Sequence, residues 1–270
     1  MIWAFAGALA VGLSLGVLGS GGSILTVPVL TYVVGQDEKV AIASSLLIVG
    51  VISLVAAIPY GIKRNLDARS VLLFGLPGMA GSYMGAALSA FASGGFQLTF
   101  LAGLMLVAAV IMFRDKKVAE PTAGAKRSAI KIALDGLIVG AITGFVGVGG
   151  GFLIVPALVL LGGLPMSKAV GTSLVIIALK SSTGFVKHLD VLAEADLELD
   201  WQVIGTFCAI GVVGSLLGSA LGSRASQASL RRGFAVFLLL MASYVVYRNA
   251  PALFEATSPQ TSSESSADPV

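Results

Sequence analysis

The first 36 residues contain no Asp, Glu, Lys or Arg. Over the whole chain, 56% of residues are hydrophobic and 11% are charged, against roughly 25% charged residues in a soluble domain. A chain of 270 residues cannot cover a soluble surface with so few charges. A helix needs about 20 apolar residues to cross the hydrocarbon core of a bilayer. The composition therefore excludes a soluble fold and predicts an all-α polytopic membrane protein.

Charges and glycines divide the chain into ten apolar segments, five in each half. The segments are 2–18, 23–35, 40–60, 70–91 and 96–113, then 131–146, 151–164, 168–188, 201–222 and 232–248. We predict a first transmembrane repeat over 1–113, a basic cytoplasmic linker over 114–130, a second repeat over 131–250 and a disordered polar tail over 251–270. The second segment of each half spans only about 20 Å as a helix, so we expect it to be short, either re-entrant or half of a broken helix.

The two halves of the chain resemble each other. Gly16–Leu30 aligns with Gly144–Leu158, and eight of the fifteen positions are identical. The same register extends through 41–53 and 169–181 and, after an insertion, relates 78–85 to 211–218. Chance could produce scattered glycine or leucine matches, but not this ordered set. The sequence therefore predicts an internal repeat.

The loops indicate how the repeats are oriented. The loop after residue 62 is basic, as are the central linker and the loop around Arg224, whereas the loop over 190–200 holds five carboxylates. Basic loops of membrane proteins face the cytoplasm. Corresponding loops of the two halves therefore lie on opposite sides, which predicts inverted repeats with both termini outside. The competing explanation is a chance distribution of charge.

A glycine-rich break precedes the short segment of each half. Helix starts at such breaks present unpaired N–H groups and a partial positive charge to an anion, and glycine lets a ligand approach them closely. Inverted repeats with matched breaks are typical of secondary transporters, which bind substrate near the midplane. The predicted substrate-binding residues here are Gly19, Ser20, Gly21, Gly22, Ser23, Gly147, Gly149, Gly150 and Gly151. The alternative is that these glycines only allow close helix packing.

Four further side chains are candidates for the same site. Lys180 lies within an apolar segment, where an ionisable residue is a functional candidate by default. It could instead extend towards the headgroups. The hydroxyls of Ser45, Thr172 and Ser173 could bind substrate or join helices.

The sequence contains no recognisable catalytic or cofactor motif. Cys208 and His188 are the single cysteine and histidine, and neither belongs to a metal-binding or nucleophile motif. We therefore expect no enzyme activity, no metal and no cofactor.

The paired motifs Gly16–Pro28 and Gly144–Pro156 resemble those of the sulfite exporter TauE/SafE family, also called the toluene sulfonate uptake permeases. The second copy continues through Leu174 in a way that is very similar to the family's second motif, and the likeness covers residues 5 to 248. Ser20 and Ser23 stand where glycine is common in the family. The resemblance implies a carrier in a bacterial-type plasma membrane that moves sulfite, sulfonates or sulfoacetate, driven by an ion gradient.

We therefore expect a secondary transporter of small sulfur-containing or organic anions, in which one repeat rocks against the other. The expected partners are the anion, the lipid bilayer and a coupling H⁺ or Na⁺. No nucleic acid is expected, and a homo-oligomer is compatible with the sequence. The rival functions are an anion channel and a non-transporting membrane scaffold or maturation factor.

Overall fold

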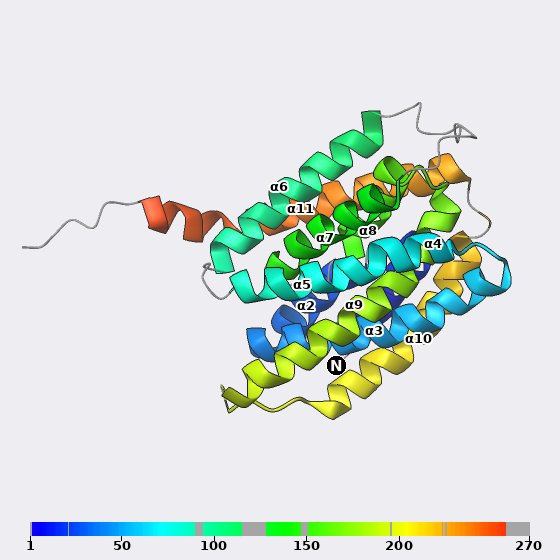
Figure 1. Ribbon diagram of the computed structural model, residues 1–270. Helices are drawn as coiled ribbons and strands as arrows, with labels where there is room; N and C mark the ends of the chain where they lie inside the picture. Colours follow the sequence, from blue (N-terminus) through cyan, green and yellow to red (C-terminus); the bar gives the residue numbers. More distant parts are fainter. Residues whose placement is uncertain are drawn as a thin grey trace, which may run out of the picture.

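The computed structural model describes residues 2–20, 22–89, 94–114, 128–146, 151–194, 196–222, 224 and 226–257. Within these ranges the regular secondary structure is helical (Figure 1). The first half contains α1 (Ile2–Leu18), α2 (Gly22–Val29), η1 (Leu30–Val34), α3 (Glu38–Ile62), α4 (Ala68–Ser70), η2 (Val71–Gly75), α5 (Leu76–Ser89) and α6 (Gly94–Arg114). The second contains α7 (Ala129–Val146), α8 (Gly151–Pro156), η3 (Ala157–Leu161), α9 (Met166–Glu194), α10 (Trp201–Gly222) and α11 (Gln227–Thr257). The all-α prediction is confirmed.

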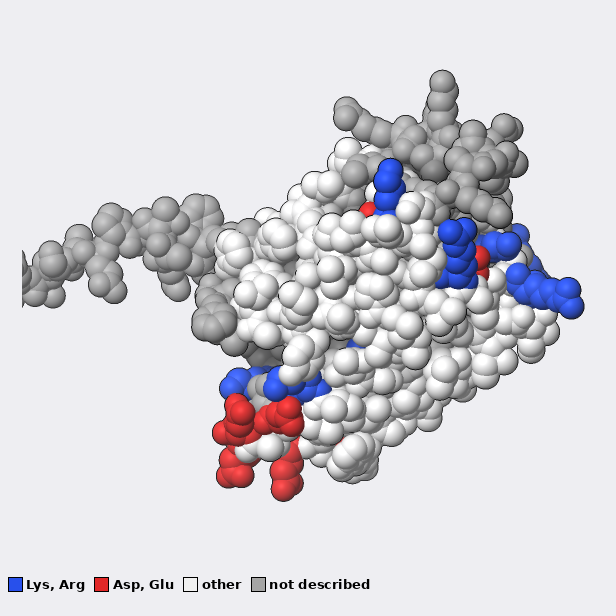
Figure 2. Space-filling model, viewed as in Figure 1, with Lys and Arg blue, Asp and Glu red and all other residues white. Residues whose placement is uncertain are grey.

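The surface is that of a membrane protein. Four described helices are long and apolar enough to cross a bilayer: Lys39–Ile62, Ala68–Leu88, Met166–Glu194 and Trp201–Gly222. In Figure 2 the charged side chains gather at opposite ends of the molecule, and a broad uncharged band separates them. The acidic group lies where α9 ends, and basic residues lie at the other end, where α3 leads into α4. The polytopic membrane fold is therefore confirmed.

Each short segment changes helix type at a proline. Pro28 is the second-last residue of α2 and the π-helix η1 follows, while Pro156 is the last residue of α8 and the π-helix η3 follows. Proline has no N–H group and its ring crowds the carbonyl four residues earlier, so the regular hydrogen-bond pattern cannot continue. A switch to the wider π-helix relieves this conflict.

The two halves meet in an inverted arrangement along α3 and α9. A Cβ atom built on Gly50 would lie 3.4 Å from Ser181, and one built on Gly184 would lie 3.4 Å from Leu46. As the residue number increases along α3, the number of the facing residue on α9 decreases. These two corresponding helices therefore run antiparallel. Ser181, which faces Gly50, is the counterpart of Ser53 in the internal repeat. A pseudo-two-fold axis that relates the two halves therefore passes close to the middle of both helices.

Glycines allow the next pairs of helices to pack backbone against backbone. A Cβ built on Gly12 of α1 would collide with the carbonyl of Gly211 on α10, and one on Gly140 of α7 would collide with that of Gly78 on α5. These two contacts are equivalent under the internal repeat. Each half therefore gives one helix to the other: α10 packs on α1, and α5 packs on α7. At these four positions, which are not those of the two chain breaks, glycine permits close helix packing.

The last helix is longer than the sequence suggested. The predicted tail begins at residue 251, but α11 continues to Thr257. The residues concerned include Ala252, Leu253 and Glu255, which are good helix formers. The remainder of the predicted tail and residues 115–127 of the predicted linker lie outside the described residues.

Candidate anion site

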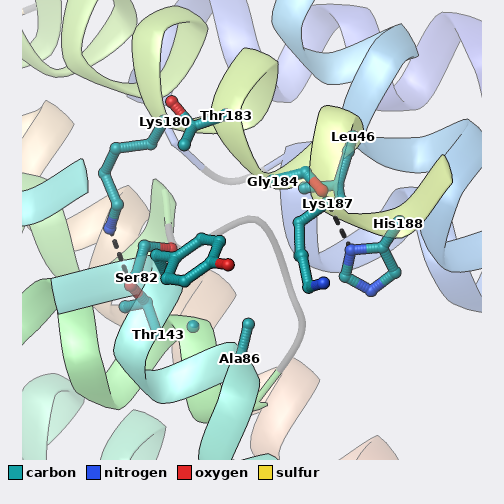
Figure 3. Close-up of a pocket in the computed structure, with 11 residues that line it drawn as sticks. Leu46, Ser82, Ala86, Thr143, Lys180, Thr183, Gly184, Lys187 and His188 are labelled. Carbon is teal, nitrogen blue, oxygen red and sulfur yellow. Dashed lines mark hydrogen bonds between the residues drawn. The ribbon is translucent and has the colours of Figure 1, made fainter. Parts of the chain in front are cut away.

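A narrow cleft lies between α5, α7 and α9 (Figure 3). About 30 Å³ of it is accessible to the centre of a water molecule, room for very few waters in this conformation. Its described lining consists of Leu46, Ser82, Tyr83, Ala86, Thr143, Gly144, Lys180, Thr183, Gly184, Lys187 and His188. This lining contains two lysines, and among its described residues there is no carboxylate. Such a cleft favours a negatively charged occupant.

Lys180 lies at the deep end of the cleft. The side chain is 2% exposed, and its Nζ donates a hydrogen bond to Thr143 Oγ1 at 2.7 Å. Among the described residues no carboxylate pairs with this ammonium group. It therefore points into the protein, and the alternative of a lysine extended towards the headgroups is wrong.

The equivalent place in the first half is apolar. The internal repeat aligns Lys180 with Ile52 and Thr143 with Leu15, and both apolar side chains are completely buried. Gly78 of α5 faces the aliphatic part of Lys180, as Gly211 of α10 faces Ile52. The backbone surroundings thus match, while the chemistry differs. Only the second half places a cation close to the pseudo-two-fold axis.

The mouth of the cleft carries a second cation. Lys187 Nζ lies 3.2 Å from a carboxylate oxygen of Asp190, and both side chains are partly exposed. His188 Nδ1 lies 3.0 Å from the carbonyl of Gly184, one turn earlier on α9. Lys187 is thus neutralised locally, whereas the deeper Lys180 is not. An anion that enters would move from a compensated to an uncompensated cation.

Two predicted site residues meet at a separate place. Gly19, with a φ of +75°, breaks the chain between α1 and α2. The single hydroxyl proton of Ser173 lies between two acceptors, the Gly19 carbonyl oxygen at 3.0 Å and the Val170 carbonyl oxygen at 2.8 Å from Oγ. Ser173 precedes Lys180 by seven positions, or about 10 Å along α9. The break therefore packs against α9 away from the cleft.

The other predicted residues have local partners. Ser45 Oγ donates to Ile42 O, Ser23 Oγ donates to Ser20 O, and Thr172 Oγ1 accepts from the backbone N–H of Asp67. The hydroxyl of Ser20 is buried without a partner among the described residues.

The remaining predicted positions are glycines at the two breaks. Gly22 and Gly151 are the first residues of α2 and α8. Gly21, Gly147, Gly149 and Gly150 lie outside the described residues. Among the predicted site residues that the structure describes, Lys180 is the one that lines the cleft.

The sequence prediction missed Thr143. Thr143 is 1% exposed and holds the ammonium group of Lys180. A comparison of the aligned halves could have identified it, because a hydroxyl replaces Leu15 at a buried position. The described part of the chain contains no group of three or more His, Cys, Asp or Glu residues that could hold a metal ion.

Comparisons with known proteins point in one direction. The family model described as sulfite exporter TauE/SafE matches residues 4–245. A probable membrane transporter protein of Xylella fastidiosa is 34% identical, covering 90% of this chain and 94% of its own. The probable membrane transporter protein YunE of Bacillus subtilis is 28% identical, and the match covers 85% of this chain and 91% of YunE. A probable membrane transporter protein of Methanocaldococcus jannaschii is 25% identical, and the match covers 80% of this chain and 84% of that protein. No solved structure matches the chain.

Proposed function

Because the chain belongs to the sulfite exporter TauE/SafE family, we propose that it is a secondary transporter of small sulfur-containing or organic anions. Sulfite, sulfonates and sulfoacetate are the substrates that this family membership suggests. The observation that carries the proposal is Lys180, a buried cation with no carboxylate partner among the described residues. A buried charge is costly unless something compensates it. An anion in the cleft supplies that compensation.

The cleft favours a defined route for the anion. Lys187 attracts it at the mouth, and Lys180 binds it beside the axis that relates the halves. Inverted-repeat carriers hold substrate near such an axis, because both sides of the membrane must reach one site in turn. The glycine breaks at Gly19–Ser23 and Gly147–Gly151 remain proposed substrate contacts in other states of the cycle.

The moving parts differ from the two repeats. Since α5 packs on α7 and α10 packs on α1, a whole repeat cannot rock without separating these backbone contacts. These backbone contacts stay intact if the helices move as two rigid bodies. One body consists of α1 to α3 together with α10, and the other consists of α7 to α9 together with α5. They meet along the α3–α9 crossing, where Lys180 lies. We propose that alternating access is a rotation of these bodies in a bacterial-type plasma membrane, coupled to H⁺ or Na⁺.

Transport by purified protein in liposomes tests this function. Liposomes loaded with unlabelled sulfoacetate should accumulate labelled sulfoacetate by exchange, with saturation, and sulfite should compete. Liposomes that are loaded in the same way but contain no protein are the control. Flux that rises linearly without saturation or exchange would favour the anion channel instead. No flux above the control, together with no binding of sulfite or sulfoacetate in detergent, contradicts the proposal.

A further inference from the structure

Thr143 makes two hydrogen bonds that fix the direction of its hydroxyl group. Its Oγ1 donates to the Gly140 carbonyl at 3.0 Å and accepts from Lys180 Nζ at 2.7 Å. Since the hydroxyl proton points at Gly140, a lone pair faces the ammonium group. The hydroxyl cannot donate to an anion at the same time. Its part in the cleft is therefore to hold Lys180.

An ammonium group has three N–H donors, and one of them points at Thr143. In the described part of the chain the other two have no partner. The long lysine side chain has many rotamers, and fixing it costs entropy. The hydrogen bond to Thr143 fixes the Lys180 side chain before an anion binds. The other two N–H donors of the ammonium group then point away from α7.

The first half shows that this polar pair is not required for packing. Leu15 and Ile52 take the equivalent places with no polar atom, and they are as deeply buried. A glycine of the neighbouring half faces each pair, Gly78 beside Lys180 and Gly211 beside Ile52. A purely structural role would be filled by the apolar pair, so the polar pair of the second half needs another explanation.

We propose that Thr143 is a positioning residue for substrate: its hydroxyl orients the ammonium group of Lys180 as the ligand of the transported anion. This inference rests on the proposed function and extends it, because it names a residue that acts through Lys180. A hydrogen bond to a charged group is among the stronger ones in proteins, so its loss has a measurable cost.

The experiment compares variants of the full-length protein in detergent and in liposomes. Thr143→Val removes the hydroxyl at nearly constant shape, and Thr143→Ser keeps it. Leu15→Val places the same side chain at the equivalent site of the other half. We expect Thr143→Val to weaken sulfoacetate binding in calorimetry and to raise the KM of uptake about tenfold. The maximal rate should stay nearly constant. Thr143→Ser and Leu15→Val should bind like the unmodified protein.

A double-mutant cycle tests the route of the effect. In Lys180→Met protein, adding Thr143→Val should cause no further loss of the remaining sulfoacetate binding, because the hydroxyl acts only through the lysine. Unchanged binding in Thr143→Val, or equal losses in Thr143→Ser and Thr143→Val, overturns the inference. Neither result affects the proposed function. Absence of binding to the unmodified protein overturns both.

Discussion

Lys180 and Ile52 occupy equivalent positions in the two halves of the molecule. Each side chain leaves the middle of a central helix and faces a glycine of the neighbouring half, Gly78 for Lys180 and Gly211 for Ile52. Both are almost completely buried. One place near the pseudo-two-fold axis is therefore cationic and its partner is apolar, so the two halves cannot contribute equally to binding.

Lys180→Met should strongly reduce anion binding and uptake, and it should stabilise the empty protein. The substitution keeps the length of the side chain and removes an unpaired buried charge, which is expected to raise the free energy of unfolding by about 1–3 kcal/mol. For a protein of this size that is an increase of about 2–4 °C in Tm per kcal/mol. Thermal unfolding in detergent and uptake in liposomes measure the two effects. Ile52→Met is the matched control and should retain uptake; a Lys180→Met protein with normal uptake removes Lys180 from the site.

Gly140→Ala and Gly12→Ala should both destabilise the protein. Each new methyl group would collide with a backbone carbonyl, which cannot move like the end of a side chain. Overpacking of this kind costs about 1–3 kcal/mol. Gly103 of α6 has no atom within 4 Å of the corresponding position, so Gly103→Ala should be neutral or stabilise by up to about 1 kcal/mol. The Tm of each of the three variants, measured by thermal unfolding, tests this prediction. Equal Tm values for all three would show that the backbone contacts at Gly12 and Gly140 are not tight.

Tyr60→Phe should destabilise the junction of α1 and α3. The Tyr60 hydroxyl donates to the Gly16 carbonyl at 2.9 Å, and the side chain is 6% exposed. Loss of a buried hydrogen bond that leaves a carbonyl without that donor costs about 1–3 kcal/mol. Tyr247, which is 76% exposed, provides the control variant Tyr247→Phe with no expected change. A Tyr60→Phe protein with the Tm of this control would contradict the assignment.

Asp190→Asn should ease entry of the anion. Asp190 neutralises Lys187 at the mouth of the cleft, so its removal leaves the attraction of Lys187 uncompensated. We expect the KM for sulfoacetate to fall about twofold at low ionic strength, because an exposed ion pair is weak. The difference should vanish at high salt, where exposed charges are screened. Asp196→Asn, which removes a negative charge from the turn that follows α9, is the control. A lower KM that persists in high salt would point to a structural effect instead.

Much of the fold could be predicted because its causes are local. Charge-free segments, glycine breaks and prolines are all visible in the sequence, and ten segments follow from them. The aligned motifs predicted the internal repeat, and the charges of the loops predicted that its two copies are inverted. In contrast, the exchange of α5 and α10 between halves depends on which glycine faces meet. Gly78 and Gly211 carry no information about their partners until the structure shows them.

The site was predictable only in part. Lys180 could be identified because a cation inside an apolar segment stands out. The direction of its side chain depends on Thr143, which lies 37 positions away on another helix. Ser173 and Thr172 share α9 with Lys180, yet they bind Gly19 and the Asp67 backbone. Spacing along one helix predicts a shared face, but not what the neighbouring helices place against it.

The exchange of helices has a consequence for biosynthesis. The glycine face of α1 fits the carbonyls of α10, and α10 begins only at Trp201. When the first half of the chain enters the bilayer, α10 is not yet present to cover this face, and the partner of α5 begins only at Ala129. The first half therefore cannot complete its packing until the second half follows, because α1 needs α10, which ends at Gly222, and α6 needs α11, which begins at Gln227.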